Sequence, residues 1–238
     1  MAASLVAARG GTTSMVISAT AASIFKSGPL AGNSVASRFE PVPKGLAAPD
    51  TVVLGGDGKH SFRELHGKAR LVSLWAEWCS ACLVEMPDLL RLQQRYGGPK
   101  FEMLAILTGS FGKLDLAGAR AALAKVGADK MPLWIEQSGE SRLLNALARR
   151  DGRPSLPCNL LLDAKGRIRG RSFGAMSAPI KLDIELGAAD MRNGRLTQSG
   201  KAKVARAQAA AAGMPQRSAW STPDGDAFIK ALASGALG

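Results

Sequence analysis

Cysteine, histidine and tyrosine are scarce in this chain of 238 residues, which has three cysteines, two histidines and one tyrosine. So few cysteines exclude a small fold stapled by several disulfide bonds. A structural zinc site needs four ligands, usually two cysteine pairs or one pair with two closely spaced histidines. Two cysteines here form a Cys-x-x-Cys pair, but His60 and His66 precede it in a loop-like stretch, and Cys158 is distant. The chain therefore does not readily supply a zinc site.

Acidic residues are in the minority. Lysine and arginine number 31 against 19 aspartates and glutamates, which gives a net charge of +12. Residues 141–218 carry most of the excess, with 15 basic and 5 acidic residues. Such a field can steer acidic partners, anionic lipid or nucleic acid. Basic stretches interleaved with aromatic residues and recognised nucleic-acid motifs are both missing, so nucleic acid is not an expected partner.

The N-terminal region has no apolar run long enough to span a bilayer comfortably. Residues 15–25 form an apolar run, but about 20 residues are needed. The run fits the core of a signal peptide, with Ser34-Val35-Ala36 as a small-x-small cleavage site. Few positive charges precede it, so a disordered cytosolic leader is the alternative. We predict that residues 1–40 are a signal or anchor followed by a linker, and that the folded domain occupies residues 41–238.

Cys79 and Cys82 carry the clearest chemical signal. The apolar run at 71–75 predicts a buried strand, and residues 80–96 have apolar side chains at helical spacing. The pair therefore lies at a strand-to-helix junction, with Cys79 at the helix N-terminus. Free N–H groups and the helix dipole favour thiolate there. We predict that Cys79 is a nucleophile in thiol-disulfide exchange and that Cys82 resolves the mixed disulfide.

Strands and helices alternate along most of the remaining chain. This alternation predicts an α/β fold with a central, partly parallel sheet and helices on both faces. A hairpin turning at Asp163-Ala164-Lys165-Gly166 adds antiparallel strands. We expect strands at 51–54, 71–75, 101–107, 133–135 and in the hairpin 160–173, a helical turn at 61–65, and helices at 80–96, 114–126 and 141–149.

From these residues the chain resembles thioredoxin-fold proteins, and more narrowly the TlpA-like disulfide reductases that face the bacterial periplasm. The run 74–82, LWAEWCSAC, matches the family's Trp-Ala-x-Trp-Cys-x-x-Cys, and Glu85-Met86-Pro87 matches its Glu-Met-Pro. Leu156-Pro157, followed by residues 158–168, resembles the family's cis-proline, strand and Asp-x-x-Gly hairpin. The resemblance covers residues 49–173 and 220–233.

The resemblance implies a role for three residues beside the cysteines. It places Leu156 and Pro157 against the substrate backbone, with a cis bond between them, and Trp78 at the lip of the active site. Because side chains alternate on a strand, Cys158 should point away from the face that Pro157 presents, as a buried inert thiol. A third thiol that joins the pair to hold Cu(I) is the alternative.

The sequence offers two candidates for the group that accepts the proton of the second thiol. Thioredoxins have a buried aspartate six residues before the first cysteine, where this chain has Ser73, and a serine cannot act as a base at neutral pH. Glu77 and Glu85 are the remaining candidates for proton transfer, with surface or helix-stabilising roles as the alternative for each.

A long segment separates the last hairpin from the final helix. In the family that helix follows the hairpin closely, whereas here Trp220 opens it after an insertion at about 175–219. The insertion is basic and has no aromatic residue. We predict a solvated excursion of the surface, with a docking or lid element as the alternative.

Together these patterns predict a reductase of protein disulfides, of the cytochrome c or copper-site maturation type, that needs no cofactor or metal. The uncharged Ser80-Ala81 lacks the histidine of strongly oxidising relatives. The expected partners are protein clients with disulfides or dithiols and an upstream electron donor, such as a membrane thiol-disulfide carrier. The expected location is the periplasm, with or without a tether to the inner membrane. The alternatives are a thiol peroxidase, normally marked by Thr-x-x-Cys, and a copper-binding assembly factor, usually marked by Cys-x-x-x-Cys and a distant histidine.

Overall fold

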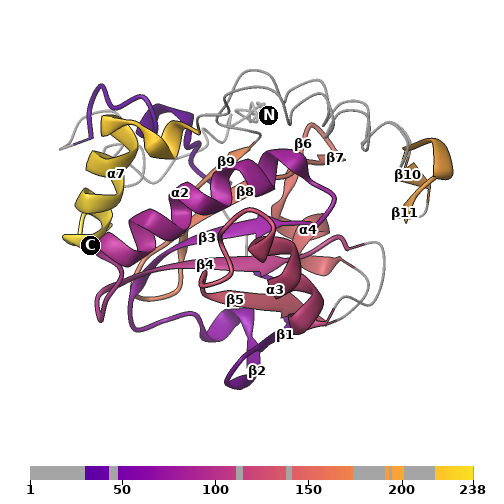
Figure 1. The fold of residues 1–238 in the computed structure, drawn as a ribbon. Coiled ribbons are helices and arrows are strands. Elements are labelled where there is room, and N and C mark those ends of the chain that lie inside the picture. The colour runs from indigo at the N-terminus through magenta and orange to yellow at the C-terminus, as the bar shows by residue number, and fades with distance from the viewer. Residues whose placement is uncertain are drawn as a thin grey trace, which may run out of the picture.

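The computed structural model describes residues 30–42, 48–110, 115–137, 141–173, 191–192, 195–200 and 218–237. A seven-stranded sheet with the strand order β2-β1-β5-β4-β3-β8-β9 forms its centre (Figure 1). The strands are β1 Val52–Gly55, β2 Gly58–Ser61, β3 Ala69–Trp75, β4 Phe101–Leu107, β5 Leu133–Glu136, β8 Cys158–Leu162 and β9 Ile168–Phe173.

The sheet is mixed, as the sequence predicts. Strands β3, β4 and β5 run parallel, and β1, β2, β8 and β9 pair antiparallel to their neighbours. Every residue of the central strand β3 is buried, which accounts for its continuous apolar sequence. The principal helices are α2 Ser80–Tyr96, α3 Leu116–Ala124, α4 Arg142–Leu147 and α7 Pro223–Ala233. The fold is therefore a helix-flanked mixed sheet, and β3 leads directly to the cysteine pair.

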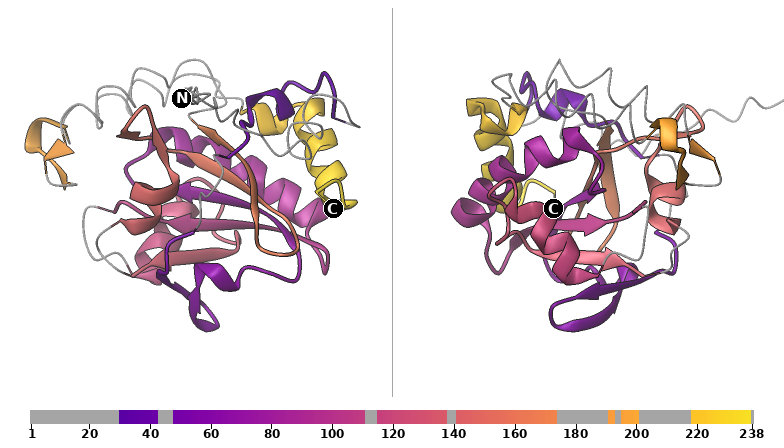
Figure 2. Two further views of the ribbon diagram at one scale, coloured as in Figure 1. Left: turned by 180° about the vertical axis from the view of Figure 1, so that it is seen from behind. Right: turned by 45° about the vertical axis from the view of Figure 1, so that its right-hand side comes forward.

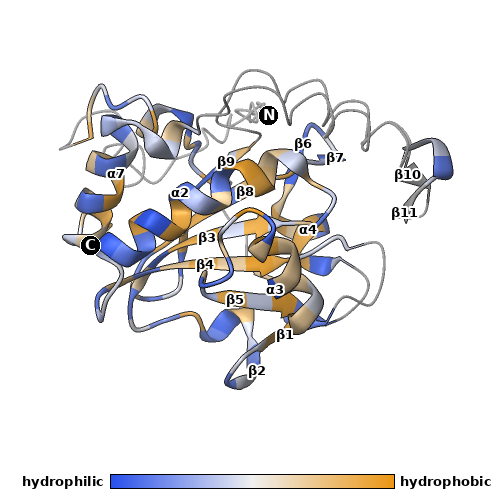
Figure 3. Cartoon of the chain, viewed as in Figure 1, coloured by the Kyte–Doolittle hydropathy of each residue, from blue (hydrophilic) through white to orange (hydrophobic). Residues whose placement is uncertain are grey.

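Local signals explain where the helices begin. Helix α2 has the predicted bounds and contains Pro87. Helix α3 starts after Asp115, whose side chain accepts a hydrogen bond from the Gly118 N–H. The short helix η2, Phe62–Glu64, has a capping box between Ser61 and Glu64. Hydropathy colouring shows apolar residues interspersed with polar ones along α2 (Figure 3), and the buried residues of this helix include Met86, Leu89 and Leu92. None of the helices in the described ranges is both long and apolar enough to cross a bilayer.

The segment from Leu30 to Glu40 belongs to the domain, so its prediction as leader and linker is wrong. Leu30, Val35, Ala36 and Phe39 are all buried. The Phe39 ring stacks on Phe228 of α7, with 5.1 Å between the centroids. The small residues of this segment suggested a linker, but their apolar neighbours fill the space beside α7. The folded domain therefore begins no later than Leu30; residues 1–29, including the apolar run 15–25, lie outside the described residues.

Polar contacts hold the same segment at both ends. The Asn33 side chain donates to the Asp224 carbonyl at 2.8 Å, and the Ser34 N–H donates to the Asp224 carboxylate at 2.8 Å. Hydrogen bonds from Ser34 lower the pKa of Asp224. At the other end, Glu40 exchanges backbone hydrogen bonds with Arg171 of β9. The segment thus links α7 to the edge of the sheet.

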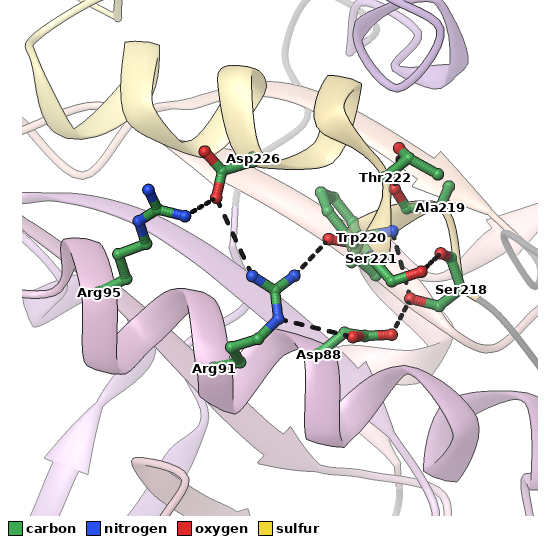
Figure 4. Close-up of polar contacts among 9 residues, drawn as sticks. All are labelled: Asp88, Arg91, Arg95, Ser218, Ala219, Trp220, Ser221, Thr222 and Asp226. Atoms are coloured by element: carbon green, nitrogen blue, oxygen red, sulfur yellow. Dashed lines mark hydrogen bonds and ion pairs between the residues drawn. The ribbon is translucent and has the colours of Figure 1, made fainter.

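The final helical unit, residues 218–233, is held to α2 by Arg91 (Figure 4). The Arg91 guanidinium donates to the Trp220 carbonyl at 3.0 Å and lies 3.8 Å from Asp88 and 3.9 Å from Asp226. The Ser218 hydroxyl donates to the Asp88 carboxylate at 2.8 Å. Trp220 is fully buried in the short helix η4, Ala219–Ser221. The late position predicted for the final helix is confirmed.

The predicted insertion needs a correction at its C-terminal end. Ser218 and Ala219 belong to the final helical unit, because the Ser218 hydroxyl also accepts a hydrogen bond from the Trp220 N–H. Within the insertion the structure describes a small hairpin, β10 Met191–Arg192 with β11 Arg195–Leu196, which lies apart from the central sheet (Figure 2). Most of residues 175–217, including the helix-forming run 201–212, lie outside the described residues.

Candidate active site

Cys79 and Cys82 form a disulfide bond at the N-terminus of α2, with 5.3 Å between their Cα atoms. Cys79 is the N-cap residue, and its Sγ accepts a hydrogen bond from the Cys82 N–H at 3.2 Å. The same N–H and the positive end of the helix would stabilise a Cys79 thiolate after reduction. Cys79 is 4% exposed and Cys82 is 1% exposed. Cys79 is therefore the more exposed residue of the pair.

The two residues before the pair are tied to the loop that follows β4. The Trp78 indole N–H donates to the Gly109 carbonyl at 2.8 Å. The Ser110 hydroxyl donates to the Glu77 carboxylate at 2.9 Å. Both Trp78 and Glu77 are intermediate in exposure, so they border the disulfide without being part of the core.

The Leu156–Pro157 peptide bond is cis, as predicted, and both residues are buried. Strand β8 begins immediately afterwards and pairs with β3 so that Cys158 lies opposite Leu74. Pro157 therefore lies beside the C-terminal end of β3, from which the chain leads to the disulfide. The register places Leu156 and Pro157 at the end of the sheet from which the chain runs on to Trp78, Cys79 and Cys82.

A buried polar cluster lies between α2 and the sheet. Glu85 is 1% exposed, and its carboxylate accepts a hydrogen bond from the Asn159 side-chain amide at 3.4 Å. Asn159 is the register partner of Ser73, so these two side chains share the face of the sheet that packs against α2. The Asn159 Oδ1 and the Ser73 hydroxyl are buried and find no hydrogen-bond partner within the described residues. Glu85 is therefore an interior residue of the site.

Asn159 is a functional candidate that the sequence reasoning missed. It is fully buried in β8, whose other side chains are apolar or cysteine. One polar residue in an otherwise apolar buried strand was the available signal, because buried amides need hydrogen-bonding partners.

Cys158 is fully buried and points away from the disulfide side of the sheet, as predicted. Its thiol lies 3.8 Å from the Leu147 carbonyl at the end of α4, whereas the neighbouring Asn159 contacts α2. Burial raises the pKa of the Cys158 thiol to about 12. Among the residues described, no group of three or more His, Cys, Asp or Glu side chains is arranged to hold a metal ion.

We expect Cys158 to resist thiol reagents while the protein is folded. The shift of its pKa from 9.0 to about 12 lowers its thiolate population by about 10³-fold at neutral pH. With the disulfide intact, labelling by a maleimide at pH 8 should proceed only as fast as the protein unfolds. Rapid labelling of native protein, with fluorescence showing no unfolding, would contradict the buried position.

The same shift predicts a loss of stability at alkaline pH. Above pH 9 the unfolded chain releases the Cys158 proton, whereas the folded chain keeps it until about pH 12. The Cys158 contribution to unfolding free energy therefore falls by about 1.4 kcal/mol per pH unit within this window. Urea titrations of the native chain and Cys158→Ala between pH 8 and 10 isolate this contribution, because other titrating groups are common to both.

Known proteins are similar to part of this chain. No family model matches the chain. The thioredoxin-like protein YneN of Bacillus subtilis is 29% identical over 150 residues, which are 60% of this chain and 81% of that protein. A thioredoxin family thiol:disulfide interchange protein from Chlorobium tepidum is 26% identical with a TM-score of 0.42, covering 58% of this chain and 89% of that one. The exposed lipoprotein thioredoxin Etrx1 of Streptococcus pneumoniae is 24% identical with a TM-score of 0.43, covering 56% and 96%.

Proposed function

We propose that this chain, a thioredoxin-like thiol-disulfide oxidoreductase, works as a reductase of disulfides in protein clients outside the cytosol. The observation that carries the proposal is the Cys79–Cys82 disulfide at the start of α2, at the same end of the sheet as the cis Leu156–Pro157 bond. The backbone around this bond would offer a place for an extended client segment.

The reaction balances as a two-electron exchange. The Cys79 thiolate attacks one sulfur of the client disulfide, whose other sulfur leaves as a thiolate and takes up a proton. Cys82 then loses its proton and attacks Cys79 in the mixed disulfide, which releases the second client thiol. The client has gained two electrons and two protons, and the chain is left with the disulfide seen in the structure. An external dithiol donor must reduce it for another cycle.

Glu85 is the better of the two candidates for the proton of Cys82. It lies three residues after Cys82 on the buried side of α2, a spacing that places two side chains on one helical face. The amide of Asn159 holds its carboxylate under the helix. Glu77 instead binds the Ser110 hydroxyl, and its proposed role is to hold the loop beside the disulfide.

Glu85→Gln should slow the second step of the exchange more than the first. A positioned general base contributes at least about 10²-fold, and glutamine keeps the shape of the side chain without the basic group. Single-turnover kinetics with a preformed Cys79 mixed disulfide measure the release step directly. The matched control is Glu77→Gln. Equal release rates in Glu85→Gln and the native chain between pH 6 and 8 would remove Glu85 from the proton path.

The location and partners follow from the same proposal. The family resemblance and the apolar run 15–25 favour export to the periplasm, with or without a tether to the inner membrane. Clients of the cytochrome c or copper-site maturation type would present a disulfide that must be reduced before the cofactor is attached. A membrane thiol-disulfide carrier is the proposed electron donor.

The test is electron transfer from the reduced chain to a disulfide-bonded protein. We expect turnover of a test protein such as insulin, with the appearance of its free thiols. Consumption of hydrogen peroxide without protein reduction would favour a peroxidase. Tight stoichiometric binding of Cu(I) without protein reduction would favour a copper-assembly protein.

A further inference from the structure

A short hairpin of arginines leads directly into the cis-proline. Strand β6, Arg149–Arg150, pairs antiparallel with β7, Arg153–Pro154. Asp151 and Gly152 make the turn with φ of 51° and 75°, the left-handed conformations typical of a tight hairpin. The Ser155 N–H donates to the Ala148 carbonyl at 2.8 Å and extends the pairing towards Leu156. The hairpin therefore has a defined shape beside the active site.

Arg171 of β9 fixes the base of this hairpin. Its guanidinium donates to the carbonyls of Leu147 and Arg149 at 3.3 and 3.5 Å. It also donates to the Glu40 carboxylate at 3.0 Å and lies 4.8 Å from the centroid of the Phe173 ring. These contacts join the hairpin to the sheet edge and to the N-terminal segment.

The charge of the hairpin is largely uncompensated within the described residues. Arg149, Arg150 and Arg153 are exposed and face one acidic residue of the hairpin, Asp151. Arg149 donates to the Gly152 carbonyl. Arg150 and Arg153 pair with each other through their backbones, and their side chains form no hydrogen bond or ion pair with another described residue.

Two carboxylates that bind arginines of the β8–β9 unit are already paired. Arg171 pairs with Glu40 at 3.0 Å, and Arg167 and Arg169 pair with Asp163 at 2.8 and 3.3 Å. Neither carboxylate is therefore left to neutralise the hairpin. The guanidinium groups of Arg150 and Arg153 remain able to bind carboxylates of another molecule, for which their planar donor geometry is well suited.

We propose that this hairpin recognises acidic residues that flank the reactive cysteine of the client. The inference rests on the proposed function, since the client disulfide must reach Cys79 beside Pro157. Arg153 precedes Pro157 by four residues, a span of at most about 14 Å in extended chain. The recognised aspartates or glutamates should therefore lie within about four residues of the client cysteine. Such contacts act mainly on association and weaken with salt.

The test compares three synthetic peptides with the same disulfide and different flanks. The flanking residues are aspartate and glutamate in one peptide, serine in the second and lysine in the third. We expect the native chain to reduce the acidic peptide with a kcat/KM about 10-fold above that of the serine peptide at low salt. The advantage should shrink to below about 2-fold at 0.5 M salt, because screening shortens the range of the field.

The double variant Arg150→Ser, Arg153→Ser should lose this advantage and keep the native rate on the serine peptide. The matched control is Lys125→Ser, Lys130→Ser, which removes the same charge from exposed positions. Lys125 and Lys130 precede β5, and β5 runs parallel to β3, so they lie at the end of the sheet opposite the disulfide. This control should keep at least about two thirds of the native preference for the acidic peptide, because distant charges are screened.

Three outcomes would overturn the inference. They are equal rates on the acidic and serine peptides in the native chain, an unchanged preference in the hairpin variant, and an equal loss in the lysine control. Failure to reduce any of the three peptides would instead overturn the proposed function. Circular dichroism and the melting temperature of each variant verify that the fold is kept.

Discussion

A reduced Cys82→Ser variant mixed with its client will accumulate as a covalent complex joined through Cys79. Cys79 can still attack, because its Sγ lies at the helix N-terminus and receives the N–H of residue 82. The serine hydroxyl cannot displace the client sulfur, so the mixed disulfide persists. Turnover of a protein disulfide should fall to the level of the uncatalysed exchange. Non-reducing electrophoresis and intact mass spectrometry would show the complex, and dithiothreitol would dissolve it.

Cys79→Ser is the control for this assignment. The remaining Cys82 lies within the first turn of α2 and not at its N-cap, and it is less exposed than Cys79, so it should form far less complex with a protein client. Trapping by Cys79→Ser but not by Cys82→Ser would reverse the two roles. Trapping by neither variant, with the native chain active, would show that exchange proceeds without a persistent mixed disulfide.

Phe39→Ala should destabilise the domain by about 3 to 5 kcal/mol, the usual cost of removing a buried aromatic ring. Phe39 is 4% exposed and packs against Phe228 and Trp220, with centroid separations of 5.1 and 6.4 Å. For a domain of this size the loss corresponds to a fall in melting temperature of roughly 6 to 20 °C. Differential scanning calorimetry measures this fall.

Two further variants bracket the Phe39 result. Phe39→Leu should lose less stability than Phe39→Ala, because leucine retains much of the apolar volume of phenylalanine. Val52 is 50% exposed, so the free energy of unfolding of Val52→Ala should stay within about 0.5 kcal/mol of that of the native chain. A melting temperature that Phe39→Ala leaves unchanged would restore the interpretation of residues 30–40 as a linker.

The sequence predicted those parts of the fold whose signals are local. The bounds of α2 and β4 agree with the structure because both have strong periodicity or a continuous apolar run next to clear breaks. The packing of residues 30–40 was missed because its partners, Asp224 and Phe228, lie about 190 residues away in the sequence. No pattern within a short window reveals such contacts.

The arginine hairpin was missed for a different reason. Apolar spacing extended the predicted helix to Arg149, whereas α4 ends at Leu147 and Arg149 begins β6. The Asp151-Gly152 pair is a strong signal for a two-residue turn and could have corrected this prediction. In the candidate site, the cysteines and the cis-proline followed from motifs, but the contact between Glu85 and Asn159 depends on how β8 packs under α2.

The fastening of Asn33 and Ser34 to Asp224 fixes the point at which the chain ahead of Leu30 joins the domain. Asp224 lies in the first turn of α7, and Asp226 of the same turn pairs with Arg91 of α2. Arg91 is twelve residues beyond Cys79, and at 1.5 Å per residue this separates the two by about 18 Å along the helix axis. An attachment ahead of Leu30 would therefore act on the flank of the domain near α7 and not on the end of α2 that carries the disulfide.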